Sequence, residues 1–250
     1  MIPGPTIIKK CSECSGLIQE HSIISGNSVG AQYWTDGKRE LPMLPDQPWL
    51  VKCPHCQNLL WIDELEEIRE SELWKDLKFP KSNNEQELQD YFAKLKSKSY
   101  NEPELQDYFA KLKSNNLSSK KILYIRTRAW WKGNDVRRTN DILEEMRKYW
   151  KNLPDKSSKK AETGRYIERN SIPKEKLILS DEERNNLQML YDILNSSDDD
   201  LLMKAEIKRE LGQFEDAEDI LKHRFDEEYS QYYSVIKKLV EKRDPIVAKM

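Results

Sequence analysis

The strongest constraint in this chain is a pair of short cysteine motifs, Cys11-Ser-Glu-Cys14 and Cys53-Pro-His-Cys56. They hold all four cysteines of its 250 residues. Two thiolates separated by two residues can grip one metal ion, and two such loops complete the tetrahedral set of four thiolates that zinc prefers. The sequence therefore predicts one structural Zn²⁺, with Cys11, Cys14, Cys53 and Cys56 as its ligands.

Other chemistries of a doubled Cys-X-X-Cys pattern stay open. A redox-active pair normally begins a helix after a strand in a βαβ unit, and no such setting is visible. A four-cysteine iron–sulfur centre is a further alternative, whereas a catalytic zinc is disfavoured because four thiolates leave no position for water. His55 can replace a cysteine as ligand, although we expect it to be exposed beside the site. His21 and His223 have no partners at metal-binding spacing.

Short apolar segments, which we interpret as strands, flank both motifs. With Cys11, Cys14, Gly16, Cys53, Pro54 and Cys56 between them, the pattern resembles the zinc-ribbon fold. This resemblance implies a zinc-ribbon domain over residues 1–62. The 38 residues between the motifs are more than usual for a ribbon and form a long insert rich in proline and tryptophan.

The insert contains a predicted hairpin turn at Asp36-Gly37, since this pair tolerates the positive φ angles of a two-residue turn. Large aromatic side chains are frequent in and near the insert. They either fill the core of the small domain or form a partner-binding surface, and they are Tyr33, Trp34, Trp49 and Trp61.

Most of the remaining chain is predicted to be helical. The fold class is therefore α+β, a small N-terminal β-rich zinc ribbon followed by antiparallel helix pairs. Asp63 with Glu66 forms a capping box that predicts a helix to about residue 77.

The region 63–153 also contains a tandem duplication with a 17-residue offset, in segments 84–97 and 101–114, which share ELQDYFAKLKS. Each copy is an amphipathic helix, either a tolerated change in length or a docking arm.

Glycine, proline and polar residues predict where the later helices begin and end. A helix over 118–132 is predicted to end at Gly133, and a second one to run to about residue 153. Residues 154–176 are polar and lysine-rich and are interpreted as a linker. Ser180 with Glu183 forms another capping box, which opens the C-terminal helices of residues 177–250.

The string ELGQFEDAEDIL resembles the turn of a tetratricopeptide helix pair. Gly212 would end the first helix, Phe214 would lie two residues later, and Ala217 would let the second helix approach closely. The whole assembly resembles bacterial zinc-ribbon proteins with an α-helical, tetratricopeptide-like C-terminal region. The resemblance implies no particular activity, and it leads us to expect a protein partner for the C-terminal helices.

A basic and aromatic segment, residues 120–138, is the other candidate binding site. Residues 117–176 carry 17 basic and 8 acidic side chains, a charge that can attract an anionic partner. Cations that neutralise phosphates and a tryptophan that stacks on a base would bind nucleic acid. The candidates are Arg126, Arg128, Trp131, Lys132, Arg137 and Arg138. The alternative, which we favour, places Trp130 and Trp131 in the core and pairs the arginines with the protein's own acids.

Several function classes are disfavoured by what the sequence lacks. It has no phosphate loop, no dinucleotide-binding turn and no nucleophile elbow, so we expect no enzymatic activity and no small-molecule substrate. It has no run of 18 apolar residues and no recognisable signal peptide, so we expect a cytoplasmic protein without a membrane partner. The first hypothesis is a non-enzymatic adaptor that mediates protein–protein interaction, and the second is a nucleic-acid-binding protein.

Overall fold

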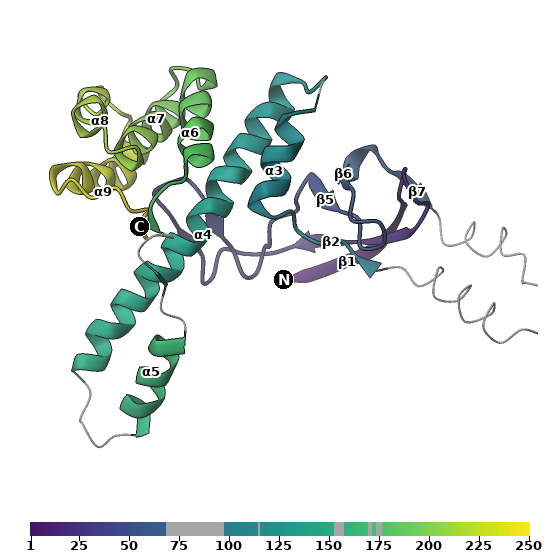
Figure 1. Ribbon diagram of the computed structural model, residues 1–250, viewed down its shortest axis with the longest axis horizontal. Coiled ribbons are helices and arrows are strands. Elements are labelled where there is room, and N and C mark those ends of the chain that lie inside the picture. The colour runs from purple at the N-terminus through teal and green to yellow at the C-terminus, as the bar shows by residue number, and fades with distance from the viewer. Residues whose placement is uncertain (69–97, 115, 153–157, 170–171, 174–176) are drawn as a thin grey trace, which may run out of the picture. The chain divides into compact units, whose positions relative to one another are not determined.

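The computed structural model describes residues 1–68, 98–114, 116–152, 158–169, 172–173 and 177–250. The chain divides into two compact units. The ribbon unit comprises Met1–Ala31 and Glu40–Asp107, and the helical unit comprises Gln32–Arg39 and Tyr108–Met250. Small strands early in the chain, followed by helices that pack in pairs, confirm the predicted α+β class (Figure 1).

The ribbon unit contains a four-stranded sheet in the order β7-β1-β2-β8. β1 (Ile2–Lys10) and β2 (Leu17–Ser25) pair antiparallel, so the first cysteine motif lies in the loop between them. β7 (Glu66–Ile68) extends the sheet antiparallel to β1, and β8 (Lys98–Ser99) lies parallel to β2. The sheet thus holds the first motif at one of its ends.

A second, smaller hairpin carries the other motif. β5 (Leu50–Lys52) pairs antiparallel with β6 (Leu59–Trp61), and the second cysteine motif forms the loop between them. The buried core among the described residues of this unit is small and includes two of the cysteines. One cluster consists of Cys11, Ile18, Val51, Cys53, Leu60 and Ile62, and Leu17, Leu50 and Trp61 are buried as well. So few apolar side chains give limited hydrophobic stabilisation, which is typical of domains that need a further cross-link.

The predicted helix from Asp63 is wrong over the residues that the structure describes. Ile62–Glu64 forms one 3₁₀ turn (η1), and the chain then continues as β7. Backbone pairing with the edge of β1 therefore prevails over the local capping signal. The rest of that predicted helix, and the first copy of the duplication at 84–97, lie outside the described residues.

The second copy of the duplication forms a helix, α3 (Leu105–Leu112), as predicted, although it begins later than expected. Asn101 instead makes a β-bridge with Lys52, and their backbones exchange two hydrogen bonds of 2.9 and 3.0 Å. The apolar face of the amphipathic pattern is the buried one, because Tyr108 and Phe109 are both buried.

The helical unit is organised around α4 (Ser119–Lys151), a single helix of 33 residues. The predicted break at Gly133 is therefore wrong. A Cβ added to Gly133 would lie 2.5 Å from Oε1 of Glu183, so the glycine serves a close approach of helices rather than a helix end.

The predicted linker over 154–176 also contains a helix. α5 (Ser158–Arg169) packs against α4, and the indole nitrogen of Trp150 donates to the carbonyl of Lys160 over 2.9 Å (Figure 1). Gly164 allows this approach, since a Cβ there would lie 3.1 Å from the same indole nitrogen. This contact ties α5 to the long helix α4.

The C-terminal helices follow the predicted signals closely. α6 (Asp181–Ile193) begins with the capping box of Ser180 and Glu183, with both reciprocal hydrogen bonds present. α7 (Asp198–Glu210) ends at Gly212, whose φ of +78° is the left-handed conformation expected of a helix C-terminus.

The last elements are α8 (Phe214–Ile220), a 3₁₀ turn over Glu227–Tyr229 (η3) and α9 (Ser230–Glu241). α7, α8 and α9 pack around one apolar cluster, whose buried members are Leu202, Ala205, Ala217, Leu221, Ile236 and Val240. A second cluster joins Trp130 of α4 to α6 and to Ile207 of α7. None of the described helices combines the length and the apolar character that a membrane crossing requires.

The central part of the insert belongs to the helical unit. This insert hairpin, Gln32–Arg39, turns at Gly37, where φ is +78°, and Trp34, Thr35 and Asp36 are at most 1% exposed. Strands β3 (Gln32–Tyr33) and β4 (Arg39–Glu40) form its legs.

The four aromatic residues singled out in the sequence have different environments. Trp34 and Trp61 are buried, the first in the helical unit and the second in the ribbon unit, whereas Tyr33 and Trp49 are 39% and 38% exposed. The expectation of a single small aromatic core is therefore met only in part.

Candidate metal centre

The two loops bring all four cysteine sulfurs to one point in the ribbon unit. The four Sγ atoms lie within 4.8 Å of one another. The sulfurs of Cys11 and Cys56 are 3.8 Å apart, as are those of Cys14 and Cys53. Each close pair takes one cysteine from each motif, so the sulfurs interlock and can hold a metal ion between the two loops.

Both motifs use the same backbone turn. In the first, the amide of Cys11 donates to Gly16 and the amide of Ser15 donates back to Cys11, each over 3.0 Å. In the second motif, the amide of Gln57 likewise donates to the carbonyl oxygen of Cys53, also over 3.0 Å. Ser15 and Gln57, each directly after its second cysteine, have φ angles of 58° and 64°. These strained, left-handed residues fold each loop tightly around its sulfurs.

The thiols differ in how readily they ionise. Burial raises the pKa of Cys53 to about 12, although the amide of His55 donates to its sulfur over 3.4 Å. Burial also raises the pKa of Cys14. Burial opposes ionisation of Cys11 too, but backbone amides of Cys14 and Glu13 outweigh it and lower its pKa. Burial thus opposes the ionisation of Cys14 and Cys53, and the positive charge of a bound metal ion would offset this effect.

His55 connects the two loops instead of joining the sulfur set. Its Nε2 atom lies 2.9 Å from the carbonyl oxygen of Leu17, just after the first motif. Its ring lies against Gly16, where a Cβ would be 2.6 Å from the imidazole. His55 is half-buried, so the expectation of an exposed histidine is wrong. Among the described residues, the group able to hold a metal contains the four cysteines only.

A second concentration of functional groups lies inside the helical unit, where Asp36 of the insert hairpin meets α4. The Asp36 carboxylate accepts from Nη2 of Arg138 and from Nδ2 of Asn134, the latter over 2.9 Å. Burial raises the pKa of Asp36 despite the guanidinium beside it. The indole of Trp131 also donates to the Asp36 carbonyl over 2.9 Å, which fixes the turn to α4.

Glu210, at the end of α7, shares one donor, Asn134, with Asp36. It accepts from the indole of Trp130 over 2.9 Å and from Nδ2 of Asn134 over 3.0 Å. Burial, reinforced by the nearby carboxylates of Glu206 and Asp36, raises the pKa of Glu210 to about 8. Glu210 is one of the residues that line a cavity of about 240 Å³.

The third buried acid of this network is paired within its own helix. Glu206 and Arg209 form an ion pair of 2.5 Å with both side chains fully buried. Burial works against the charge of Arg209, but Glu206 outweighs it and raises the pKa of the guanidinium. The hydroxyl of Tyr232 donates to the carbonyl of Thr35 beside this pair.

Sequence reasoning missed this network, and one signal could have found it. Leu202, Glu206 and Arg209 recur at helical spacing on the face of α7 that carries Leu202 into the core. Charged residues at such positions must be paired, because burying an unpaired charge is costly. For Asp36, the turn motif gave no hint of burial.

The predicted nucleic-acid-binding residues have partners inside the helical unit. Arg138 is paired with Asp36, and Arg137 forms a 3.0 Å ion pair with Glu183 while only 4% of its side chain is exposed. Arg126 donates to Asn186 over 3.2 Å.

The other three predicted residues lie on the same helix. Trp131 is bound to the insert hairpin as described above, and the guanidinium of Arg128 lies 5.6 Å from the centre of the Trp131 ring. Lys132 is half-buried next to Trp131. Arg137 and Arg138 thus both have carboxylate partners within the helical unit.

Comparison of the chain with protein-family models, with curated proteins and with solved structures gave no match.

Proposed function

We propose that this protein is a non-enzymatic adaptor in which a zinc ion stabilises the ribbon unit and the helical unit binds a protein partner. The zinc assignment rests on the sulfur geometry. Zinc–sulfur bonds of about 2.3 Å in a tetrahedron place neighbouring sulfurs about 3.8 Å apart. Two of the six sulfur–sulfur distances are 3.8 Å, and all four sulfurs lie within 4.8 Å of one another. This arrangement is the observation that carries the zinc part of the proposal.

The proposed ion has a structural role. Four thiolates fill the tetrahedral shell and leave no position for a water or a substrate. Zinc sites of this type contribute about 10–16 kcal/mol to folding, enough for a unit with so small an apolar core. Cys11 and Cys53 themselves belong to that core, so the metal would hold together the strands on which they lie.

The helical unit is the proposed binding module. Several of its buried charges pair with one another, as in the pairs of Asp36 with Arg138 and Glu206 with Arg209. Such groups determine the fold and leave recognition to the outer surface. An open groove between α8 and α9 supplies a surface suited to a protein segment.

Co-purification from the native cell, with metal analysis on the same sample, tests both parts. We expect about one zinc per chain and a stoichiometric protein partner. Fewer than about 0.5 zinc per chain, or a colour indicating iron, contradicts the metal assignment. Repeated recovery of the chain without a partner contradicts the adaptor role.

Nucleic-acid binding by residues 120–138 stays a prediction, and the buried ion pairs of Arg137 and Arg138 favour the adaptor instead. A gel shift with single- and double-stranded DNA and RNA separates the two. Phosphate contacts strengthen as salt is lowered, so absence of a shift at about 50 mM salt ends the nucleic-acid hypothesis.

A further inference from the structure

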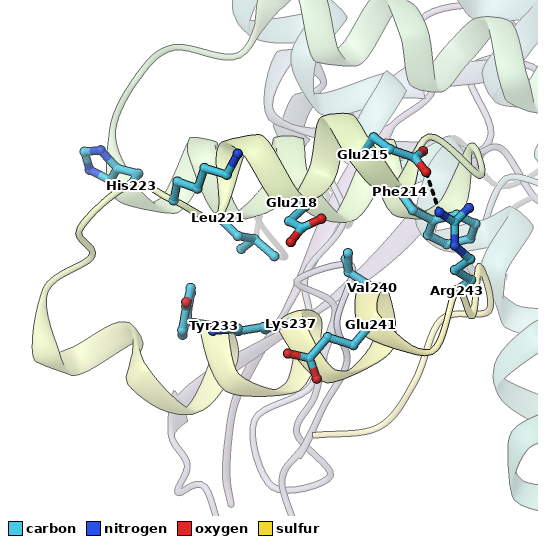
Figure 2. Close-up of a pocket in the computed structure, with 11 residues that line it drawn as sticks. Phe214, Glu215, Glu218, Leu221, His223, Tyr233, Lys237, Val240, Glu241 and Arg243 are labelled. Carbon is cyan, nitrogen blue, oxygen red and sulfur yellow. Dashed lines mark hydrogen bonds and ion pairs between the residues drawn. The ribbon is translucent and has the colours of Figure 1, made fainter.

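Two hollows of the helical unit differ in the charges that line them. The groove between α8 and α9 has a volume of about 410 Å³ and is lined by three carboxylates and three lysines or arginines. Arg243 pairs with Glu215 at one of its ends (Figure 2). Because its charges balance, they favour no particular occupant. The smaller cavity of about 240 Å³ is different, since its lining residues match one class of ligand.

This smaller cavity, which we call the arginine pocket, lies where α4, α6, the end of α7 and the C-terminal segment meet. It is lined by Arg137 of α4, Arg184 of α6 and Glu210 of α7. Apart from Gly212, the other lining residues are apolar, and they are Leu177, Ile178, Leu179, Leu211, Pro245 and Ile246. A mostly apolar pocket with a few converging polar groups is typical of small-molecule sites, and this one is slightly smaller than the usual range of about 300–1,000 Å³.

Arg137 brings unused hydrogen-bond donors to the pocket, although only 4% of its side chain is exposed. Its Nε donates to the carbonyl of Leu177 over 3.1 Å, and its Nη1 donates to Asn134 and Glu183 over 3.1 and 3.0 Å. Its Nη2 donates to no residue that the structure describes. Because the guanidinium is planar, Nη2 shares an edge with Nε and lies on the side of Leu177, a pocket residue. A ligand in the pocket can therefore accept from Nη2.

The pocket carries a net positive charge near neutral pH. Glu183 balances the charge of Arg137. Arg184 is exposed, and in the described part of the chain its guanidinium pairs with no carboxylate. Burial raises the pKa of Glu210 to about 8, so at pH 7 this acid is mostly protonated and cancels little of the charge of Arg184. One unbalanced positive charge remains, which complements a ligand with a single negative charge.

We propose that the arginine pocket binds a small organic monocarboxylate with a short apolar body. The carboxylate accepts from Nη2 of Arg137 and from the guanidinium of Arg184, whose planar donors match its two oxygens. The apolar body covers Ile178, which is 64% exposed, and the other apolar residues of the lining. Phosphate fits less well, because it carries a second charge and has no apolar part. The inference goes beyond the adaptor function and does not depend on it, since it assigns a bound ligand and no reaction.

Amide NMR titrations of the full-length protein with hexanoate and with benzoate test the pocket. Ligands of this size should bind with a Kd of about 1 mM. We expect both carboxylates to give saturable shifts at the amides of Leu177–Leu179 and Leu211. Benzamide, the neutral isostere of benzoate, should bind about fivefold more weakly because it lacks the charge that pairs with Arg184. Inorganic phosphate should give no saturable shift at these amides.

Arg184→Gln removes the unbalanced charge without breaking an ion pair of the described chain. It should weaken benzoate binding about fivefold and leave benzamide binding unchanged. The matched control is Arg224→Gln, at an exposed position outside the pocket, which should bind as the wild type does. No saturable shift with either carboxylate up to about 10 mM would overturn the proposal. Equal affinity for benzoate and benzamide, equal binding by the two arginine variants, or phosphate binding as tight as that of benzoate would overturn it as well.

Discussion

The carboxylate of Asp36 and the guanidinium of Arg138 form an ion pair that is buried on both sides, with 0% and 3% of the side chains exposed. Asp36 comes from the insert between the two cysteine motifs, and Arg138 from the middle of α4. Both lie in the helical unit. The chain therefore leaves the ribbon unit between its two cysteine loops, contributes buried residues to the other unit, and returns.

Replacing Asp36 by asparagine should destabilise the helical unit strongly. Asparagine keeps the size of the side chain but removes the buried one of the two carboxylates that pair with Arg138, and leaves only the half-exposed Asp135, 2.7 Å away. Removing one partner of a buried pair costs up to about 3–5 kcal/mol. Urea unfolding followed by circular dichroism measures the loss. The control is Asp219→Asn, which breaks the exposed pair with Lys222, about 70% exposed on both sides, and should leave the midpoint unchanged.

The double variant Asp36→Leu/Arg138→Met refines this prediction. Removing both charges avoids a buried guanidinium that has lost its buried partner, so the double variant should be more stable than Asp36→Asn alone. If Asp36→Asn unfolds at the wild-type urea concentration, the pair does not hold the insert hairpin in the helical unit.

The stability of the helical unit should also depend on Glu210. Its pKa is raised from the ordinary 4.5 to about 8 in the folded protein, so the folded state holds a proton that the unfolded state has released. The stabilisation that comes from this tighter proton binding is fully present below pH 4.5 and is lost as the pH rises toward 8. Glutamine mimics the protonated acid, so Glu210→Gln should retain stability over that range while the wild type loses it.

The measurement is the difference in unfolding free energy between Glu210→Gln and the wild type at a series of pH values. Comparing the two proteins cancels groups with the opposite dependence, such as Glu183, whose pKa Arg137 holds below its usual value despite burial. The difference should grow from pH 5 to pH 8 in favour of the variant. A constant difference would mean that Glu210 is ionised throughout.

Metal binding should separate the cysteines from the neighbouring histidine. Cys53→Ser removes one of four thiolates and should abolish stoichiometric zinc and the folded state of the ribbon unit, because so small a core depends on the metal. His55→Gln should keep about one zinc per chain, since His55 lies outside the sulfur set. Elemental analysis gives the metal content, and amide NMR spectra report the fold. A zinc-free His55→Gln variant would make the histidine a ligand.

The sequence predicted those features that depend on residues close together in the chain. The cysteine spacing gave the sulfur cluster, and the capping box of Ser180 and Glu183 opens α6 as expected. The turn at Gly37 was also predicted, but not its burial, because the partner of Asp36 lies 102 residues away. The helix α5 was missed as well, because its residues are polar and lysine-rich and its contact with Trp150 of α4 is not visible in the sequence.

Gly133 shows the same limit, and it leads to a test. Glycine normally weakens a helix interior by about 1 kcal/mol relative to alanine, so a helix end was the natural interpretation. In the structure, α4 runs through Gly133, and a Cβ there would lie 2.5 Å from Oε1 of Glu183. That oxygen accepts the 3.0 Å hydrogen bond from Arg137. The missing side chain at Gly133 therefore leaves room for the Glu183 carboxylate of α6, which forms an ion pair with Arg137 of α4.

Gly133→Ala should accordingly destabilise the protein, although it improves the helix propensity of α4. The new methyl group displaces the Glu183 carboxylate from the almost fully buried guanidinium of Arg137, at a cost of about 1–3 kcal/mol that exceeds the propensity gain. Thr139→Ala, at an exposed position of the same helix, gains propensity without a clash and should be neutral or stabilising. Thermal unfolding of both variants decides the matter. If Gly133→Ala melts above the wild type, the close approach of Glu183 to α4 is not needed for stability.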